Sequence, residues 1–329
     1  SVAGAAYQAA LEYARDRKQG ASMAHWKDAT APRVPIIAHA DVRRMLLEMK
    51  ARSEGPRALC IKLAYHSDWV RSLKGKDDQL AAYHQGQVDL LVPLVKAYST
   101  DQAFKVCELA IQTFGGHGYL KDHPVEQACR DSKIFSIYEG TNAIQSMDLV
   151  GRKLGQGGGA NTKAFLGDIQ KFIDANKAHP VLGDAVGQLQ RAHGAVGQCV
   201  MQFLQWFQGG QMQNIPLNSE RFLEIMGELA IGWLLLEQAA LGLEKIEGLS
   251  ETHPDRVVAH VLASRVSTVQ LVDDAGRRAV AARAHNGLFG RIAAAEQEGA
   301  LVHHALRDRA SSNETGRQCR RRRRRRRRR

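Results

Sequence analysis

Residues 112–145 read QTFGGHGYLKDHPVEQACRDSKIFSIYEGTNAIQ, and they contain the end of one predicted helix and the start of another. Glu139 lies within them on a turn beside Gly140, just before the amphipathic segment AIQSMDLVGRKL. A carboxylate at a helix N-terminus is stabilised by the helix dipole without an ion-pair partner. Such a carboxylate suits a catalytic base. A glutamate in this position can also do no more than complement the dipole, and the residues alone leave both interpretations open.

Working outward from this segment, apolar residues recur at helical spacing, and no segment alternates convincingly with the period of two expected of a strand. In residues 1–155 this pattern predicts an all-α bundle of antiparallel helices. The proline-containing stretch after the first helix is predicted to be a loop, and Asp41 to cap the second helix. Pro93 is expected to interrupt the third helix, and Ser99–Gln102 has the capping-box spacing that would begin a fourth.

A glycine-rich stretch, QGGGA at residues 156–160, predicts a flexible boundary. Three more amphipathic helices are expected after it, with apolar stripes that are explained by core packing rather than by a ligand site. We therefore divide the chain into a helical bundle (1–155), an additional helical domain (156–275) and a poorly ordered tail (276–329). The tail ends in ten consecutive arginines, which repel one another and cannot form a core. They are interpreted as an artefact, an engineered tag, or a disordered arm for anionic partners.

Composition excludes several classes of function. At 44% hydrophobic and 24% charged residues, the chain is typical of soluble globular proteins, and no run of apolar residues predicts a membrane-spanning helix. The net charge of +12 is due to the arginine run, since the remainder has 36 basic and 34 acidic residues. No nucleic-acid binding is therefore expected, except non-specific binding by the tail.

Cysteine and histidine usage points to a cytoplasmic protein without a metal site. The five cysteines contain no CxxC pair, which fits reduced thiols buried as small apolar side chains. The thirteen histidines form no HExxH motif, so no metal is expected. Because helical periodicity begins at Ser1 without a charged leader, the chain is interpreted as a fragment rather than a secreted precursor.

Several short motifs resemble the C-terminal helical domain of acyl-CoA dehydrogenases, in the same order along the chain. They are Gln112-x-x-Gly115-Gly116-x-Gly118-Tyr119, Pro124-Val125-Glu126, Arg130-Asp131-x-Lys133-Ile134 and Ile137-Tyr138-Glu139-Gly140-Thr141. The following GTNAIQSMDLVGRKL is most similar to the long branch of the family that includes 3-(methylthio)propionyl-CoA dehydrogenase. The resemblance is strong over residues 1–155, weaker over 156–250, and absent beyond.

The resemblance implies a role for the Glu139 turn. In the family, the glutamate at this position removes the α-proton of an acyl-CoA, and the β-hydrogen leaves as hydride to FAD, which gives a trans-2-enoyl-CoA. The backbone N–H of the same residue helps to hold the thioester oxygen. Gly140 would then allow the thioester to approach closely.

The resemblance also implies FAD contacts at other positions. Gln112, Gly115 and Gly116 match residues that contact the adenosine diphosphate part of FAD, usually across a subunit interface, although a plain helix C-cap would explain the glycines as well. Thr141 matches a cofactor-binding position and could equally be an N-cap. Arg17 matches a flavin-phosphate arginine, but its motif here is shortened and lacks the family's aromatic residue.

Implied partners are an acyl-CoA substrate, an electron-transfer flavoprotein, and further copies of the chain in a dimer or tetramer. No membrane partner is expected. The family's N-terminal helical domain and flavin-covering β-domain have no counterpart in these residues. The alternative function is therefore a non-catalytic helical module for oligomerisation or interaction.

Overall fold

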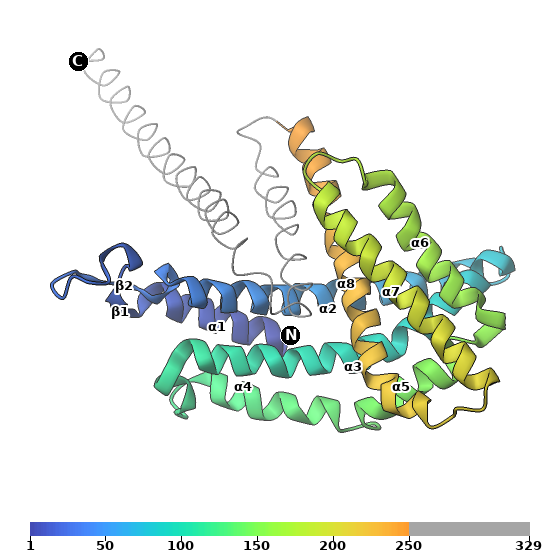
Figure 1. Cartoon of the computed structure of the whole chain (residues 1–329), viewed down its shortest axis with the longest axis horizontal. Helices are drawn as coiled ribbons and strands as arrows, with labels where there is room; N and C mark the ends of the chain where they lie inside the picture. The colour runs from blue at the N-terminus through green and yellow to red at the C-terminus, as the bar shows by residue number, and fades with distance from the viewer. Residues whose placement is uncertain (250–329) are drawn as a thin grey trace, which may run out of the picture. The chain divides into compact units, whose positions relative to one another are not determined.

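The computed structural model describes residues 1–249, and helices dominate them (Figure 1). The predicted tail, 276–329, and the last part of the predicted second domain lie outside the described residues. The α-helices are α1 Val2–Asp16, α2 Ala40–Leu73, α3 Asp78–Phe114, α4 Pro124–Ser132, α5 Asn142–Asp148, α6 Ala160–Asn176, α7 Gly183–Gln208 and α8 Asn214–Gly248. The shorter elements are β1 Lys18–Ala21, η1 Met23–His25, β2 Arg33–Pro35, η2 Ile36–Ala38, η3 Gly115–Tyr119, η4 Lys133–Ser136, η5 Leu149–Lys153 and η6 Gln156–Gly159.

Two long helices, α2 and α3, organise the described residues, and one end of this pair packs against α1 and α4 (Figure 1). On α1 the buried residues Ala6, Ala10 and Ala14 recur every fourth position and so form one stripe. They belong to one hydrophobic cluster with Val106 and Ala110 of α3, both fully buried. Small side chains on this stripe allow α1 to lie close to its neighbours, which is why so alanine-rich a helix can contribute to a core.

The other half of the α2–α3 pair packs against α6 and α8, which in turn pack against α7, in a second hydrophobic cluster. Helix α8 contributes the fully buried Ala230, Ile231 and Leu235. It also approaches α3 so closely that a Cβ added at Gly227 would lie 2.5 Å from the ring of Tyr98. This cluster contains residues from both sides of the boundary that we predict at 155/156. The boundary itself remains a prediction from the sequence.

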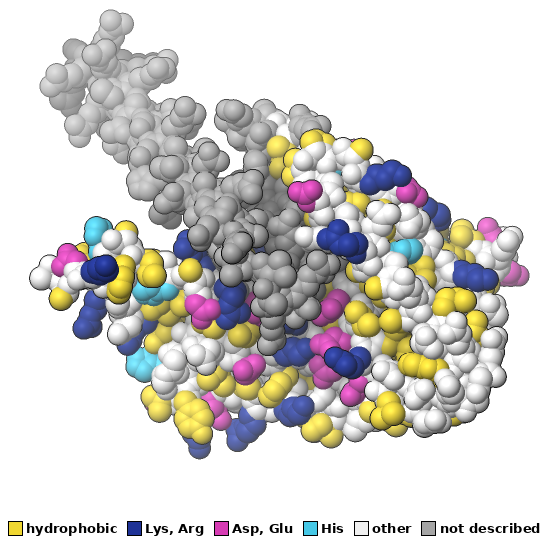
Figure 2. Space-filling model, in the orientation of Figure 1, with side chains coloured by type: hydrophobic (Ala, Val, Ile, Leu, Met, Phe, Trp, Pro, Cys, Tyr) yellow, Lys and Arg dark blue, Asp and Glu magenta, His cyan; other side chains and the backbone are white. Residues whose placement is uncertain are grey.

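Helix α8 is long and apolar enough to cross a membrane by length and composition alone. In the structure, however, 67% of its most apolar window is buried inside the protein. Its apolar side chains therefore form part of the hydrophobic core. On the face shown in Figure 2, basic and acidic side chains of the described residues are interspersed, as expected of a segment with nearly balanced charge.

Three local predictions made from the sequence are wrong. The segment predicted to be a loop contains a short antiparallel ribbon, in which Lys18 of β1 pairs with Pro35 of β2. Asp41 is not the cap of α2: the helix begins at Ala40 without a side-chain cap, and Asp41 instead forms an ion pair with Arg44 at 2.8 Å. Among the four cysteines within residues 1–249, none forms a disulfide, but Cys60 is exposed rather than buried.

The predicted break in the middle of α3 is also absent. Helix α3 continues through the buried Pro93 and through the predicted capping box. Thr100 uses its hydroxyl to donate to the carbonyl of Lys96 at 2.8 Å, one turn back in the same helix. Side chains that could cap a helix can make this bond within one, so the local pattern was ambiguous. The predicted end at Gly115 is confirmed, with φ +61° and its N–H bonded to the carbonyl of Gln112.

Candidate active site

The Glu139 turn, which we define as residues 138–142, connects η4 to α5. Glu139 has φ +54° and is the single residue other than glycine with a positive φ within residues 1–249; Gly140 follows with φ +84°. A left-handed conformation is unfavourable for a residue with a side chain, and such strain is concentrated at functional sites. Glu139 is exposed and makes no hydrogen bond or ion pair with another described residue. Its carboxylate is therefore available to a ligand.

Polar contacts with α3 hold this turn in place. The Lys96 ammonium donates to the carbonyl oxygen of Gly140 and to Oδ1 of Asn142, each at 2.9 Å. Asn142 is only 5% exposed, and its amide nitrogen donates to the carbonyl of Ala97 at 3.1 Å and to the hydroxyl of Thr100 at 3.0 Å. The bonds of Asn142 are therefore directed to two successive turns of one buried helix.

A partly buried carboxyl on α3, that of Asp101, lies next to Asn142 of the turn. Burial raises the pKa of Asp101 above its ordinary value, although a hydrogen bond from Asn142 and the charges of Lys105 and Lys133 act in the opposite direction. The positive groups near this carboxyl thus offset part of the cost of burying it.

Helix α5 begins at the last residue of the turn, Asn142, with Thr141 at the N-cap position. The backbone of Thr141 accepts from the N–H of Ile144 at 2.9 Å, but its hydroxyl makes no capping bond. The N-cap interpretation is therefore correct for the backbone and leaves the hydroxyl open to other partners. On its inner face, α5 is joined to α8 by a 3.0 Å hydrogen bond between the buried hydroxyls of Ser146 and Ser219.

The other predicted residues lie at the far end of α3, in what we call the glycine end: Arg17, Gln112, Gly115 and Gly116. Tyr13, one turn before Arg17, stacks on Phe114 with ring centroids 4.1 Å apart. The backbone N–H of Arg17 donates to the carbonyl of Tyr13, so Arg17 lies at the same end as the glycines. Added Cβ atoms at Gly115 and Gly116 would meet no atom of residues 1–249 within 4 Å, so no part of this segment covers the backbone there.

The two groups of predicted residues do not come together within one chain. Lys96, which holds the Glu139 turn, and Gln112 of the glycine end are 16 residues apart on α3. At 1.5 Å per residue that is roughly 24 Å along the helix axis. In Figure 1, η3 and the start of α4 lie at one end of α3, and α5 lies toward the other.

Sequence reasoning missed Lys96 and gave Asn142 no role. Asn142 directly follows the motif, so its position was a usable signal. Lys96 precedes Glu139 by 43 residues, and no local pattern connects the two. Only the packing of α3 against the turn shows the contact.

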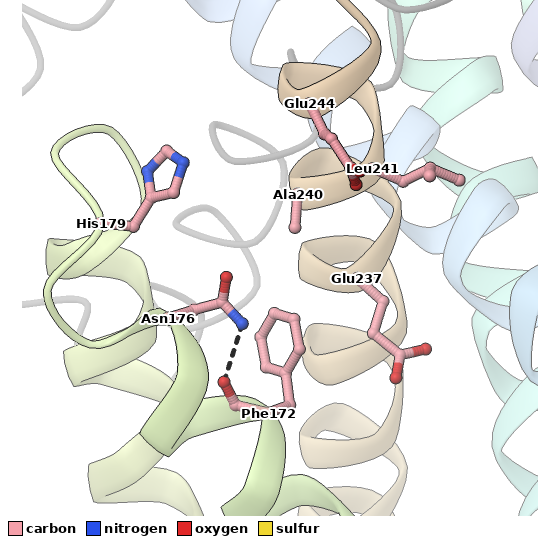
Figure 3. A pocket seen from close by; sticks show the side chains of 7 residues that line it. All are labelled: Phe172, Asn176, His179, Glu237, Ala240, Leu241 and Glu244. Atoms are coloured by element: carbon pink, nitrogen blue, oxygen red, sulfur yellow. Dashed lines mark hydrogen bonds between the residues drawn. The ribbon is translucent and has the colours of Figure 1, made fainter.

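A cavity of about 450 Å³ lies elsewhere, between α6 and α8 (Figure 3). Asn176 and His179 face it from the α6 side, and Glu237 and Glu244 from α8. The amide of Asn176 donates to the carbonyl of Phe172 at 2.9 Å. None of the predicted site residues lines this cavity.

Two family models match the chain. Residues 1–154 match the model for "Acyl-CoA dehydrogenase, C-terminal domain", and residues 165–270 match "Acetyl-CoA dehydrogenase C-terminal like". The broad-specificity linear acyl-CoA dehydrogenase FadE5 of Mycobacterium tuberculosis is 38% identical over 248 residues, which cover 73% of this chain and 40% of that protein. The 3-methylmercaptopropionyl-CoA dehydrogenase of Ruegeria pomeroyi is 38% identical over 242 residues, covering 71% and 39%. The chain thus spans about two fifths of the length of these relatives.

Solved structures agree on the architecture. The Caenorhabditis elegans protein ACDH-11, crystallised with C11-CoA, superposes with a TM-score of 0.59 at 16% identity, covering 83% of this chain and 40% of that one. An acyl-CoA dehydrogenase from Bacillus anthracis, complexed with FAD, gives a TM-score of 0.59 at 16% identity, covering 83% and 44%. At this identity the likeness concerns the fold alone, and it confirms the predicted all-α class.

Proposed function

This chain belongs to the acyl-CoA dehydrogenase family, and on that premise we propose that it forms the C-terminal portion of an FAD-dependent acyl-CoA dehydrogenase. In this proposal the enzyme oxidises an acyl-CoA to a trans-2-enoyl-CoA, and Glu139 is the base. The observation that carries the proposal is the unpartnered, exposed carboxylate of Glu139 on a left-handed turn that α3 holds in place.

The chemistry requires a carboxylate in a fixed position. A proton α to a thioester is weakly acidic, and a carboxylate of ordinary pKa removes it only if the developing charge is stabilised and water is excluded. Within residues 1–249, the backbone N–H of Glu139 donates to no other group. One residue thus offers both a proton acceptor and a donor for the thioester oxygen, and the neighbouring Gly140 has no side chain to obstruct the approach.

The glycine end fits part of a dinucleotide site. No part of residues 1–249 covers the backbone at Gly115 and Gly116, and Arg17 places a cation at the same end of the bundle. FAD, when bound, supplies the acceptor for the β-hydrogen. Because the two groups lie roughly 24 Å apart along α3, we assign them to different FAD sites of a homo-oligomer, a dimer or tetramer, in which each site combines residues of two chains. The proposal includes Thr141 as a cofactor contact through its hydroxyl.

The remaining parts of the proposal concern the whole protein. Its substrate is an acyl-CoA, its electron acceptor is an electron-transfer flavoprotein, and its location is the cytoplasm. Support for the acyl-CoA substrate comes from the relatives, whose names describe them as acyl-CoA dehydrogenases.

The test is Glu139→Gln in the full-length parent enzyme. The amide keeps the shape and the backbone N–H but cannot accept a proton, so FAD and acyl-CoA should bind normally while flavin reduction slows by several orders of magnitude. Stopped-flow bleaching of the flavin by an acyl-CoA measures this. Glu244→Gln, an exposed glutamate on α8, is the matched control and should reduce at the wild-type rate. Near-normal reduction in Glu139→Gln would leave the non-catalytic helical module as the better description.

A further inference from the structure

Lys96 contacts the Glu139 turn on both sides of the base but does not contact the base itself. Its ammonium lies 5.9 Å from the ring centroid of Tyr138, before Glu139, and donates to Gly140 and Asn142, after it. Both hydrogen-bond acceptors are uncharged oxygens. The lysine therefore does not form an ion pair with the Glu139 carboxylate, which would lower the basicity of that carboxylate.

The turn needs such a contact because its backbone is unfavourable. Glu139 adopts φ +54°, and a left-handed conformation persists for a side-chain-bearing residue only where its surroundings impose it. Hydrogen bonds from an ammonium are stronger than those between neutral groups, so the bond from Lys96 to the Gly140 carbonyl restrains the peptide next to the base.

The helix that carries Lys96 is rigidly placed. Leu94, Ala97 and Tyr98 beside it are 0%, 1% and 1% exposed, all within the larger hydrophobic cluster. Asn142 is bonded to the same stretch of α3, through Ala97 and Thr100. The side chains of Lys96 and Asn142 thus fix the turn to a helix that is anchored in the core.

We propose that Lys96 is a positioning residue for the base. It fixes the carbonyl of Gly140 and thereby keeps the carboxylate and the N–H of Glu139 on the open side of the turn. This inference rests on the proposed function, since it gives Lys96 a role in the step assigned to Glu139.

The experiment compares Lys96→Met with wild type in the full-length parent enzyme. Small displacements of a catalytic group can slow a reaction on the order of 100-fold, so flavin reduction should slow by about that factor, with acyl-CoA affinity within about threefold of wild type. Lys96→Arg, which retains a cationic donor, should recover at least half of the loss on a logarithmic scale. Lys171→Met is the control, because Lys171 lies on α6, where it pairs with Asp168 at 2.8 Å rather than with the Glu139 turn. Its reduction rate should remain that of wild type.

A second measurement separates positioning from general stability. In the 329-residue chain, Lys96→Met should speed amide exchange in residues 139–142 at least about tenfold over Lys171→Met, while exchange in α1 and α4 stays equal in the two variants. Equal loosening throughout the bundle would identify a purely structural lysine and overturn the inference.

The two hypotheses fail separately. If Lys96→Met reduced its flavin at the wild-type rate while Glu139→Gln did not reduce it, Lys96 would have no positioning role. Glu139 would still be the base. Normal reduction in Glu139→Gln would refute the proposed function, whatever Lys96→Met does.

Discussion

Apart from Arg17, the glycine end and the Glu139 turn come from one continuous stretch of sequence, yet different forces hold them. At the glycine end, Tyr13 stacks on Phe114, and a Cβ added at Gly118 would lie 2.7 Å from the backbone oxygen of Ile111. The Glu139 turn is held instead by charged and amide hydrogen bonds and has a strained backbone. Close packing suits a region that must be a rigid platform. Polar bonds to a strained turn suit a region that presents a reactive group.

This comparison makes the glycine end the more sensitive of the two to added volume. Gly118→Ala should destabilise the chain by about 3 kcal/mol, because a rigid backbone cannot move away from the new methyl group. Gly116→Ala, where a Cβ meets nothing within 4 Å, is the matched control and should change stability by less than about 0.5 kcal/mol. Urea unfolding measures both. Similar values for the two variants would mean that this end is not closely packed.

A second prediction destabilises the bundle at a site away from both regions. It tests whether the Glu139 turn and the glycine end lose stability together with the rest of the bundle. His66 and His84 form a buried pair with Nδ1 atoms 2.8 Å apart, where α2 and α3 meet. Burial, together with the charges of Lys62 and His84, lowers the pKa of His66 to about 4, against an opposing effect of Asp168. An unfolded histidine titrates near 6.5, so the unfolded state binds more protons between about pH 4 and 6.5.

Stability should therefore be complete above about pH 6.5 and fall by about 2 kcal/mol between pH 7 and pH 5. Denaturant titrations at several pH values measure this. His66→Leu should flatten the dependence, and the exposed His25→Leu should not. Amide exchange at pH 5 should show both regions weakened in parallel with the bundle. Selective loosening of the Glu139 turn would mean that its bonds, rather than the histidine pair, respond to acid.

The smallest expected effect concerns the strain at Glu139. Asparagine tolerates the left-handed region better than glutamate does, so Glu139→Asn should stabilise the chain by a few tenths of a kcal/mol, or about 1 kcal/mol at most. Thermal unfolding of the 329-residue chain measures the change. A glutamate that only complements the dipole of α5 would give the opposite sign, with a loss of up to about 1 kcal/mol.

Helical periodicity and the order of short motifs were enough to predict the all-α class, the family and the end of α3 at Gly115, because these depend on residues close together in the sequence. The breaks predicted within α3 were wrong. Pro93 and the capping-box spacing of Ser99–Gln102 are local signals for a helix boundary, but the burial of the apolar face of the same helix outweighs them.

What only the tertiary structure decided is how the predicted site residues are distributed. The sequence placed Gln112, Gly115, Gly116, Glu139, Gly140 and Thr141 within thirty residues of one another. The chain nevertheless turns back along α3 through α4 and carries the last three to the middle of α3, beside Lys96. The bond between Lys96 and Gly140 arises in the same way, because it joins residues 44 positions apart that no local pattern relates. Backbone preferences act over a few residues, whereas side-chain packing alone brings distant segments together.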